Sequence, residues 1–426
     1  MDIKNICENW FKNPLINPKT NRKIIKDSPK YKEFKKICNK IDINEEIDKN
    51  DNDRIKIFKL INSILTSINN KNSNNTCVKC SSINQCYIGD FIKIDEILSS
   101  GTLSGVIYKS NINNNNISIK IVNDYETISK KTINNDINCE IRTLEFLTKY
   151  VIKTGFPHFP ITYDVLKCER KLLNKYDNIP DDIVKLYKKN ARGNILMIIS
   201  ELADGSLYNF YMNELKQDYK SDINKKILLN TFGQIFISLI FFHKIVNAYH
   251  NDSHTGNFLF RKIAPGGYYH YKIFNKDYYI ENLGYVWEIW DFGLTIAFSN
   301  SEEINNNRID IIEKKLFSYK YKKPRKLIKY FSINTQNRNV IFDYYYNISH
   351  YNRMISMFPN NNDSKYLYDF FNEFKSNNFI NKNSSLNPLN VSVVDDYVLS
   401  LMLKYNLIKD KINTSDIIIN KEPYLI

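Results

Sequence analysis

The sequence predicts an α+β protein with two lobes, a small sheet-rich lobe followed by a mainly helical one. Short β-branched runs alternate with Gly or Asn turns between residues 87 and 122, as strands do. The stretch 227–246 is long, apolar and free of proline, as expected for a core helix, and helical patterns continue beyond it. A small α-helical module is expected at the N-terminus, ahead of both lobes.

The composition is that of a folded protein. Hydrophobic residues make up 43% and aromatic residues 14% of the 426 residues, unlike the composition of disordered chains. The net charge of +14 favours polyanions, but the basic residues are spread along the chain, so nucleic acid is not expected as the primary partner. Because the sequence has no apolar signal core and no run long enough for a membrane span, we expect a soluble protein that does not contact membranes.

Four segments are expected. A helix-turn-helix module covers 1–45, and a linker that carries one helix, in the apolar stretch Ile57–Ile68, covers 46–86. The first lobe and its connection to the second cover 87–203, and the helical lobe with a divergent C-terminal part covers 204–426.

Each element follows from its periodicity. Strands are predicted over Phe91–Ile94, Val106–Tyr108, Ile117–Val122 and Ile195–Ile199. Helices are predicted over Ile137–Ile152, Ile227–Val246, Ile309–Phe317, Val340–Met357, Tyr366–Phe374 and Val393–Leu407.

The strongest chemical signal follows the long helix directly. It is the run His250-Asn251-Asp252-Ser253-His254-Thr255-Gly256-Asn257. Phosphoryl transfer from ATP needs a carboxylate that orients the acceptor hydroxyl and, about five residues later, an amide oxygen that holds magnesium. Asp252 and Asn257 have this spacing, and the run resembles the catalytic loop of protein kinases.

A second carboxylate is predicted at a strand end that faces the same cleft. Asp291 opens Asp291-Phe292-Gly293 after the predicted strand 286–290, where it would chelate Mg²⁺ across the ATP phosphates. The separation from Asp252 (291 − 252 = 39) is larger than kinases usually show. The surplus contains Gly266-Gly267, which suggests an inserted hairpin.

The other nucleotide-binding candidates lie in the first lobe. Lys120, on a predicted strand, would neutralise phosphate charge, and Glu140 on the following helix would hold it, with Glu145 as the competing partner. Two further pairs are expected to contact ATP: Gly101 and Gly105 in a turn over its phosphates, and Glu201 and Leu202, after Ser200 in the gatekeeper position, at its adenine.

Residues from about 87 to 300 thus resemble the protein kinase superfamily, which implies ATP with Mg²⁺ or Mn²⁺ between two lobes. His254 stands where serine/threonine kinases usually carry Lys, as in haspin-like kinases and small-molecule phosphotransferases, and would contact the γ-phosphate. No Ala-Pro-Glu follows Asp291-Phe292-Gly293. The aspartate that braces the catalytic loop in this family could be Asp310, with an ordinary surface residue as the equal alternative.

The N-terminal module carries a second resemblance. Its pattern is Cys7, Trp10, Asn13-Pro14, Asn17-Pro18, Arg22-Lys23-Ile24, Tyr31 and Cys38. It is similar to the two-cysteine adaptor domain of large nucleocytoplasmic DNA viruses, which is found joined to viral kinases. The resemblance implies an iridovirus- or mimivirus-like serine/threonine kinase in the host cytoplasm or the virion, with a protein partner bound through 1–45.

The seven cysteines are expected to be reduced, because their number is odd and their spacing irregular. Cys77, Cys80 and Cys86 begin like a zinc site, yet a fourth ligand is not evident nearby, so partly exposed thiols are the favoured alternative. Cys139 and Cys168 are expected in the core.

The function predicted from the sequence is magnesium-dependent transfer of the ATP γ-phosphate to protein hydroxyls. Two alternatives stay open. The divergent glycine turn favours a kinase-fold scaffold (pseudokinase) that acts through its adaptor module, whereas His254 favours a small-molecule kinase.

Overall fold

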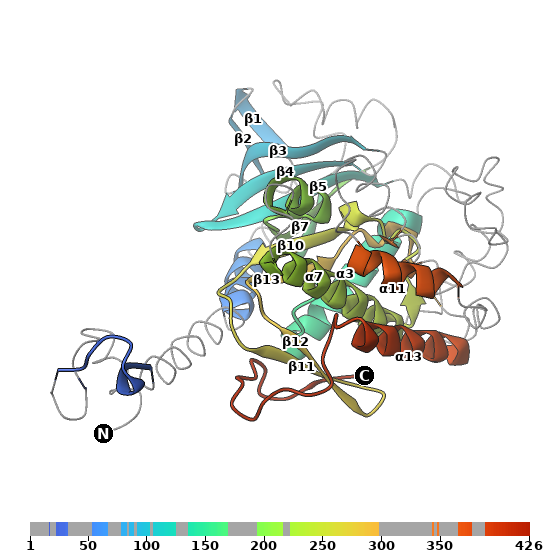
Figure 1. Ribbon diagram of the computed structural model, residues 1–426. Helices are drawn as coiled ribbons and strands as arrows, with labels where there is room; N and C mark the ends of the chain where they lie inside the picture. The colour runs from blue at the N-terminus through green and yellow to red at the C-terminus, as the bar shows by residue number, and fades with distance from the viewer. Residues whose placement is uncertain are drawn as a thin grey trace.

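The computed structural model describes residues 17, 23–32, 53–66, 78–82, 85–88, 92–102, 105–124, 135–168, 194–215, 222–297, 343–344, 347–348, 365–376 and 388–426. Within these ranges a curled antiparallel sheet lies on one side of the molecule and a mainly helical part on the other (Figure 1). The helix expected over Ile309–Phe317 and most of Val340–Met357 lie outside the described residues.

Seven antiparallel strands form the large sheet, in the order β1-β2-β3-β4-β5-β7-β6. They are β1 (Val78–Ser82), β2 (Gln85–Ile88), β3 (Ile92–Thr102), β4 (Gly105–Ile112), β5 (Asn115–Asp124), β6 (Thr162–Cys168) and β7 (Asn194–Glu201). Side chains alternate between the two faces, so that Ile119 and Ile121 are fully buried while Lys120 between them is partly exposed. Strand β1 and the first half of β2 come from the segment expected to be a linker.

Helix α3 (Asn135–Thr154) joins β5 to β6 and covers the helix expected from the periodicity. It turns Leu144, Leu147 and Val151 into the core. Gly155 ends it with φ of +69°, and its N–H donates to Val151 O at 2.7 Å. This left-handed glycine cap satisfies a carbonyl that the helix end would otherwise leave unpaired.

The helix over residues 53–66 is part of the core. Ile61 and Leu65 are completely buried. The Phe58 ring stacks on Tyr163 of β6 with centroids 6.4 Å apart, and Asn62 Nδ2 donates to Tyr163 O at 2.8 Å. The expected linker therefore contributes a packed helix to the sheet-bearing part of the protein.

The helical part is built around α7 (Asp222–Phe241), which continues into η3 (Phe242–Val246) as the apolar run predicted. The other helices described beside it include α6 (Leu207–Phe210), η2 (Tyr211–Leu215), α11 (Lys365–Ser376) and α13 (Pro388–Lys404). The stretch Asn224–Ile245 is long and apolar enough to cross a membrane, but 72% of its most apolar window is buried inside the protein. That burial is compatible with a core helix of a soluble protein.

A hairpin occupies the surplus between Asp252 and Asp291, where an insertion was expected. It consists of β11 (Tyr268–Ile273) and β12 (Lys276–Glu281). The last residues return to it, and β15 (Tyr424–Leu425) pairs in parallel with β11 (Figure 1). Tyr424 also donates its hydroxyl to Gly155 O at 3.1 Å, which ties the tail to the end of α3.

The cysteines differ from expectation. Cys86 and Cys168 each take part in a disulfide, whereas Cys139 is a buried thiol that forms none. The odd number and irregular spacing of the cysteines do not reveal which of them the fold brings within bonding distance, and so the expectation of reduced thiols was wrong for these two. A sulfur in a disulfide is not a thiolate ligand, which removes Cys86 from the zinc alternative. Cys77 lies outside the described residues.

We predict that Leu65→Ala lowers the free energy of unfolding by about 2–5 kcal/mol, because it leaves a cavity in a fully buried site. Leu60→Ala is the matched control on the same helix, since Leu60 is 40% exposed, and it should cost about 0.5 kcal/mol or less. Urea denaturation measures both. Equal losses would mean that the helix does not belong to the core.

Candidate active site

The loop that carries Asp252 is fixed by Asp343, which is completely buried. The N–H of His250 donates to Asp343 Oδ2 and the N–H of Asn251 to Oδ1, both at 2.7 Å. Ser253 Oγ donates to Asp343 O at 2.5 Å. Asn251 has a φ of 64°, so the two hydrogen bonds hold the backbone in a left-handed turn that few residues adopt readily.

Asp343 performs the bracing for which Asp310 was considered; Asp310 itself lies outside the described residues. Sequence reasoning missed Asp343, which lies 93 positions beyond His250. The available signal was an acidic residue inside the aromatic stretch 342–346, where a charge would be buried and would need partners.

His243 links Asp343 to a second buried carboxylate. Its Nε2 lies 3.0 Å from Asp343 Oδ2 and its Nδ1 3.0 Å from Asp395 Oδ1, and Tyr344 donates its hydroxyl to that same Oδ1 at 2.7 Å. Burial by itself would lower the pKa of His243, but the two carboxylates outweigh it and raise the pKa to about 9. At neutral pH an imidazolium therefore lies between the two carboxylates.

Asp252 and Asn257 converge as their spacing predicted. Asn257 Nδ2 donates to Asp252 O at 2.8 Å and lies 3.4 Å from Asp252 Oδ2. His254 Nε2 is 3.9 Å from the same carboxylate oxygen, and its Nδ1 accepts the N–H of Gly256 at 3.0 Å. A carboxylate, an imidazole and an amide thus share one short loop.

Asp291 follows β13 (Tyr285–Ile289) and approaches the lysine of the large sheet. Lys120 Nζ donates to Glu140 Oε1 and Oε2 at 2.6 and 2.8 Å and lies 3.5 Å from Asp291 Oδ1. Glu145, the competing partner for Lys120, is exposed. A single ammonium therefore connects β5, α3 and the strand that leads to Asp291.

The ion pairs set the charges at this point. Burial alone would lower the pKa of Lys120, but the negative charges of Glu140 and Asp291 outweigh it and raise that pKa. Burial likewise would raise the pKa of Asp291, but the positive charge of Lys120, with His250 and His254, holds it below the ordinary value. Both groups are thus charged at neutral pH.

Phe292 anchors the segment after Asp291 in the core. It is fully buried and stacks on Phe242, with centroids 5.4 Å apart, while the His250 ring meets it edge-on at 5.5 Å. Cys139 Sγ on α3 lies 3.6 Å from Phe292 O. Asp291 itself has φ of 61° and ψ of 74°, a strained conformation that the burial of its neighbour stabilises.

The glycine candidates border the turn between β3 and β4. Gly101 is the penultimate residue of β3 and Gly105 the first of β4. Gly105 has φ of +129°, and a Cβ there would lie 2.4 Å from Ile121 O. The position thus requires glycine whatever it binds. Residues 103 and 104 lie outside the described residues.

Backbone groups of Glu201 are already engaged. Its N–H donates to Ile161 O at 3.0 Å, and its carbonyl accepts the Ser118 hydroxyl at 3.0 Å. A carbonyl oxygen can accept two hydrogen bonds, so this carbonyl, and not the amide, is the group of Glu201 that could still meet a base. Leu202 is half-buried, and Ser200 Oγ lies 2.9 Å from Thr162 Oγ1.

The Glu201 side chain belongs to a cluster of four charged side chains. Arg54 contacts Glu201 and Glu288, and Arg261 Nε donates to Glu288 Oε1 at 2.6 Å. Burial and the negative charge of Glu201 raise the pKa of Glu288 to about 7. Burial would raise the pKa of Glu201 too, but the arginines lower it. Sequence reasoning missed this cluster, since no motif marks it.

The donor set of Asn257 and Asp291 suits magnesium, because one amide oxygen and one carboxylate are hard oxygen ligands. In phosphoryl-transfer sites such a pair is completed by substrate phosphates and water. Within the described ranges, no group of three His, Cys, Asp or Glu side chains is arranged so that it could hold a metal ion by itself. The pair could hold a metal together with a phosphate ligand.

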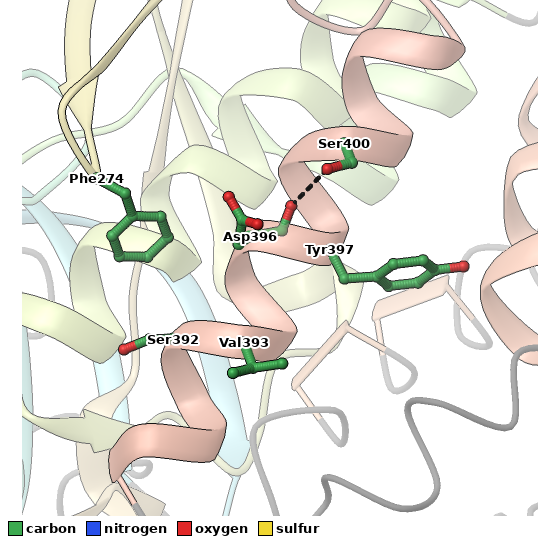
Figure 2. A pocket seen from close by; sticks show the side chains of 6 residues that line it. All are labelled: Phe274, Ser392, Val393, Asp396, Tyr397 and Ser400. Carbon is green, nitrogen blue, oxygen red and sulfur yellow. Dashed lines mark hydrogen bonds between the residues drawn. The ribbon is translucent and has the colours of Figure 1, made fainter.

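A surface cavity of about 400 Å³ lies between the β11–β12 turn and α13 (Figure 2). It is lined by Phe274, Ser392, Val393, Asp396, Tyr397 and Ser400. Figure 2 shows the Asp396 carboxylate directed toward Phe274 and the Tyr397 ring directed away from it. Asp396 pairs with exposed Lys276 at 3.5 Å. The cavity therefore offers no constellation comparable to that around Lys120.

Comparison with known proteins confirms the N-terminal resemblance. Residues 6–40 match the family model of the 2-cysteine adaptor domain. The chain is also 56% identical over 32 residues to the uncharacterized protein 378R of Invertebrate iridescent virus 6, a stretch that covers 8% of this chain and 17% of that protein. Both findings support an adaptor domain and a viral link. Most residues of the domain lie outside the described ones.

We predict a pH-dependent loss of stability that depends on His243. Its pKa rises on folding, so the stabilisation is fully present below about pH 6.5 and disappears as the pH rises through about 9. A shift of this size corresponds to about 3 kcal/mol. Denaturant unfolding of wild type and His243→Gln from pH 6 to 9.5 should show the two stabilities converging; parallel curves would contradict the assignment.

Proposed function

We propose that this chain is an ATP-dependent protein kinase with a kinase-like two-lobed fold. The observation that supports it most strongly is the position of Lys120 Nζ, 2.6 Å from Glu140 and 3.5 Å from Asp291. That lysine, helix glutamate and strand-end aspartate form the ion-pair arrangement by which kinases hold ATP phosphates and magnesium. The loop with Asp252 and Asn257 supplies the remaining groups.

Binding of ATP is assigned to Lys120, whose ammonium would neutralise phosphate charge while Glu140 keeps it in place. Asn257 and Asp291 would hold Mg²⁺ or Mn²⁺ through their side-chain oxygens. The metal supplies positive charge that stabilises the phosphate oxygens during transfer. The carbonyl of Glu201 and the backbone near Leu202 would meet the adenine, and the turn between Gly101 and Gly105 would cover the phosphates.

Transfer is assigned to Asp252, which would orient the acceptor hydroxyl and accept its proton. The hydroxyl oxygen forms a bond to the γ-phosphorus as the bond between that phosphorus and the bridging oxygen to the β-phosphate breaks, and ADP leaves. His254, 3.9 Å from Asp252, would contact the γ-phosphate. Its imidazole can donate a hydrogen bond there, as the lysine of other kinases does.

The acceptor is proposed to be a serine or threonine of a protein. The adaptor match over residues 6–40 favours a protein partner, because that segment is separate from the proposed catalytic part. The same match supports a second candidate, a kinase-fold scaffold that acts through the adaptor alone. Location in the host cytoplasm or the virion is proposed from the iridovirus similarity.

Transfer of labelled γ-phosphate from ATP with Mg²⁺ or Mn²⁺ to casein, myelin basic protein and the chain itself tests the proposal. Asp252→Ala should reduce transfer by about 10²- to 10⁴-fold, the range for a lost general base. Asp396→Asn is the control, since this exposed carboxylate lies on α13. Absence of transfer by a folded, ATP-binding wild type would favour the scaffold, unless sugars, choline or aminoglycosides are phosphorylated instead.

Asp343→Ala should lower kcat with little change in ATP affinity. The variant leaves the N–H groups of His250 and Asn251 without their acceptor, so the loop that carries Asp252 loses its position while Lys120 and Glu140 keep theirs. Because the Asp252 carboxylate is then misplaced, kcat should fall at least 10-fold. Asp343→Asn, which keeps one acceptor oxygen, should retain more activity. Equal kcat in all three proteins would contradict the bracing role.

A further inference from the structure

The side chain of Arg54 reaches from the helix over residues 53–66 into the interior and is 9% exposed. Its Nη2 donates to Glu201 Oε1 at 2.5 Å and its Nε to Glu201 Oε2 at 3.1 Å. The same Nη2 lies 2.9 Å from Phe159 O and 3.1 Å from Glu288 Oε1. The planar guanidinium thus binds both carboxylate oxygens of Glu201, the geometry for which lysine is a poor substitute.

Glu201 lies where the chain leaves the large sheet. It is the last residue of β7, in which Ile198 is the register partner of Lys120. Asp204, three residues later, is held on the other side: its N–H donates to Phe260 O at 2.8 Å, and its Oδ2 accepts the N–H of Lys262 at 2.6 Å. The connection 201–204 therefore joins the strand beside Lys120 to β10 (Phe258–Lys262), which follows Asn257 directly.

Arg54 does not have to hold its own helix in place. Apolar packing by Ile61 and Leu65 and the hydrogen bond from Asn62 to Tyr163 O fix the helix against the sheet independently. The helix over residues 53–66, which is already packed in the core, therefore places the guanidinium against the connection 201–204. The three residues that accept its hydrogen bonds lie on β7, on β13 and just before β6, so it binds segments from both sides of the proposed nucleotide site.

The remaining charges of the cluster favour this arrangement. Arg261 donates a hydrogen bond to Glu288, so that Glu288 has a charged partner besides Arg54. Glu201, in contrast, has Arg54 as its side-chain ion pair and otherwise accepts the N–H of Ile161 at 2.7 Å. Removal of Arg54 would leave the buried Glu201 carboxylate without its hydrogen-bonded ion pair at the start of the connection, and this loss favours movement of the carboxylate or binding of a proton.

We propose that Arg54 is a positioning residue for the nucleotide site: through Glu201 it holds the connection 201–204 in the conformation that binds adenine. The inference rests on the proposed function, because it assumes that ATP binds against this connection. It makes the helix ahead of the sheet a determinant of ATP affinity. It assigns no contact between Arg54 and the nucleotide.

The test compares MgATP binding by calorimetry in the full-length wild type and in Arg54→Gln, with urea denaturation of each protein. Arg54→Gln should raise the Kd for MgATP at least fivefold, and KM for ATP in parallel, with kcat changed less than twofold. Arg54→Lys should recover part of the affinity by restoring the charge, and it also replaces the Gln variant if that one does not fold.

Asn62→Ala is the matched control, because it removes a hydrogen bond of the same helix to β6 without touching Glu201. Its Kd for MgATP should equal that of wild type even where its midpoint of unfolding falls as far as that of Arg54→Gln. An equal rise in Kd in Asn62→Ala would mean that Arg54 acts only through the general stability of the protein, and it would overturn the inference. So would an unchanged Kd in Arg54→Gln. Absence of MgATP binding by the folded wild type would overturn the proposed function as well.

Discussion

The carboxylate of Asp343 is the interaction on which the candidate site depends most. Two backbone N–H groups of the loop with Asp252 end on its oxygens, and His243 joins it to Asp395 on α13. Buried charges are stable only when they are paired and hydrogen-bonded, and here His243 supplies the pairing while the loop N–H groups supply the hydrogen bonds. The contacts that link Asp343 to the helical core and the contacts that fix the loop with Asp252 therefore belong to one network.

Interactions that can be predicted from sequence are those whose partners lie in recognisable local strings. Lys120 and Glu140 lie on elements predicted from periodicity, and Asp252 and Asn257 lie within one eight-residue run; the structure brings each pair together. Arg54 is different, since its partner Glu201 is 147 positions away and neither residue stands in a motif. The apolar stretch Ile57–Ile68 predicted a helix in this region, but it did not predict the surface against which that helix is buried.

Two sets of charges connect the sheet to the helical part, and they differ in character. The Lys120 side chain is 15% exposed, and its ammonium has a second carboxylate, Asp291, that a metal ion could share. The guanidinium of Arg54 is buried and donates to Glu201, Glu288 and Phe159 O. Lys120 and its carboxylates can exchange partners when a ligand binds. The contacts of Arg54 are suited to stay unchanged and to keep the connection 201–204 in one conformation.

The pairing of β15 with β11 has a consequence for how the chain folds. The two strands are about 150 positions apart, as the hydrogen bond from His270 to Asn420 illustrates. Contacts of such long separation close late, because the loop entropy must be lost before they form. Until residues 424–425 arrive, one edge of the β11–β12 hairpin has unpaired backbone groups that could recruit another chain. The rate at which the tail docks should therefore govern the yield of monomeric protein during refolding.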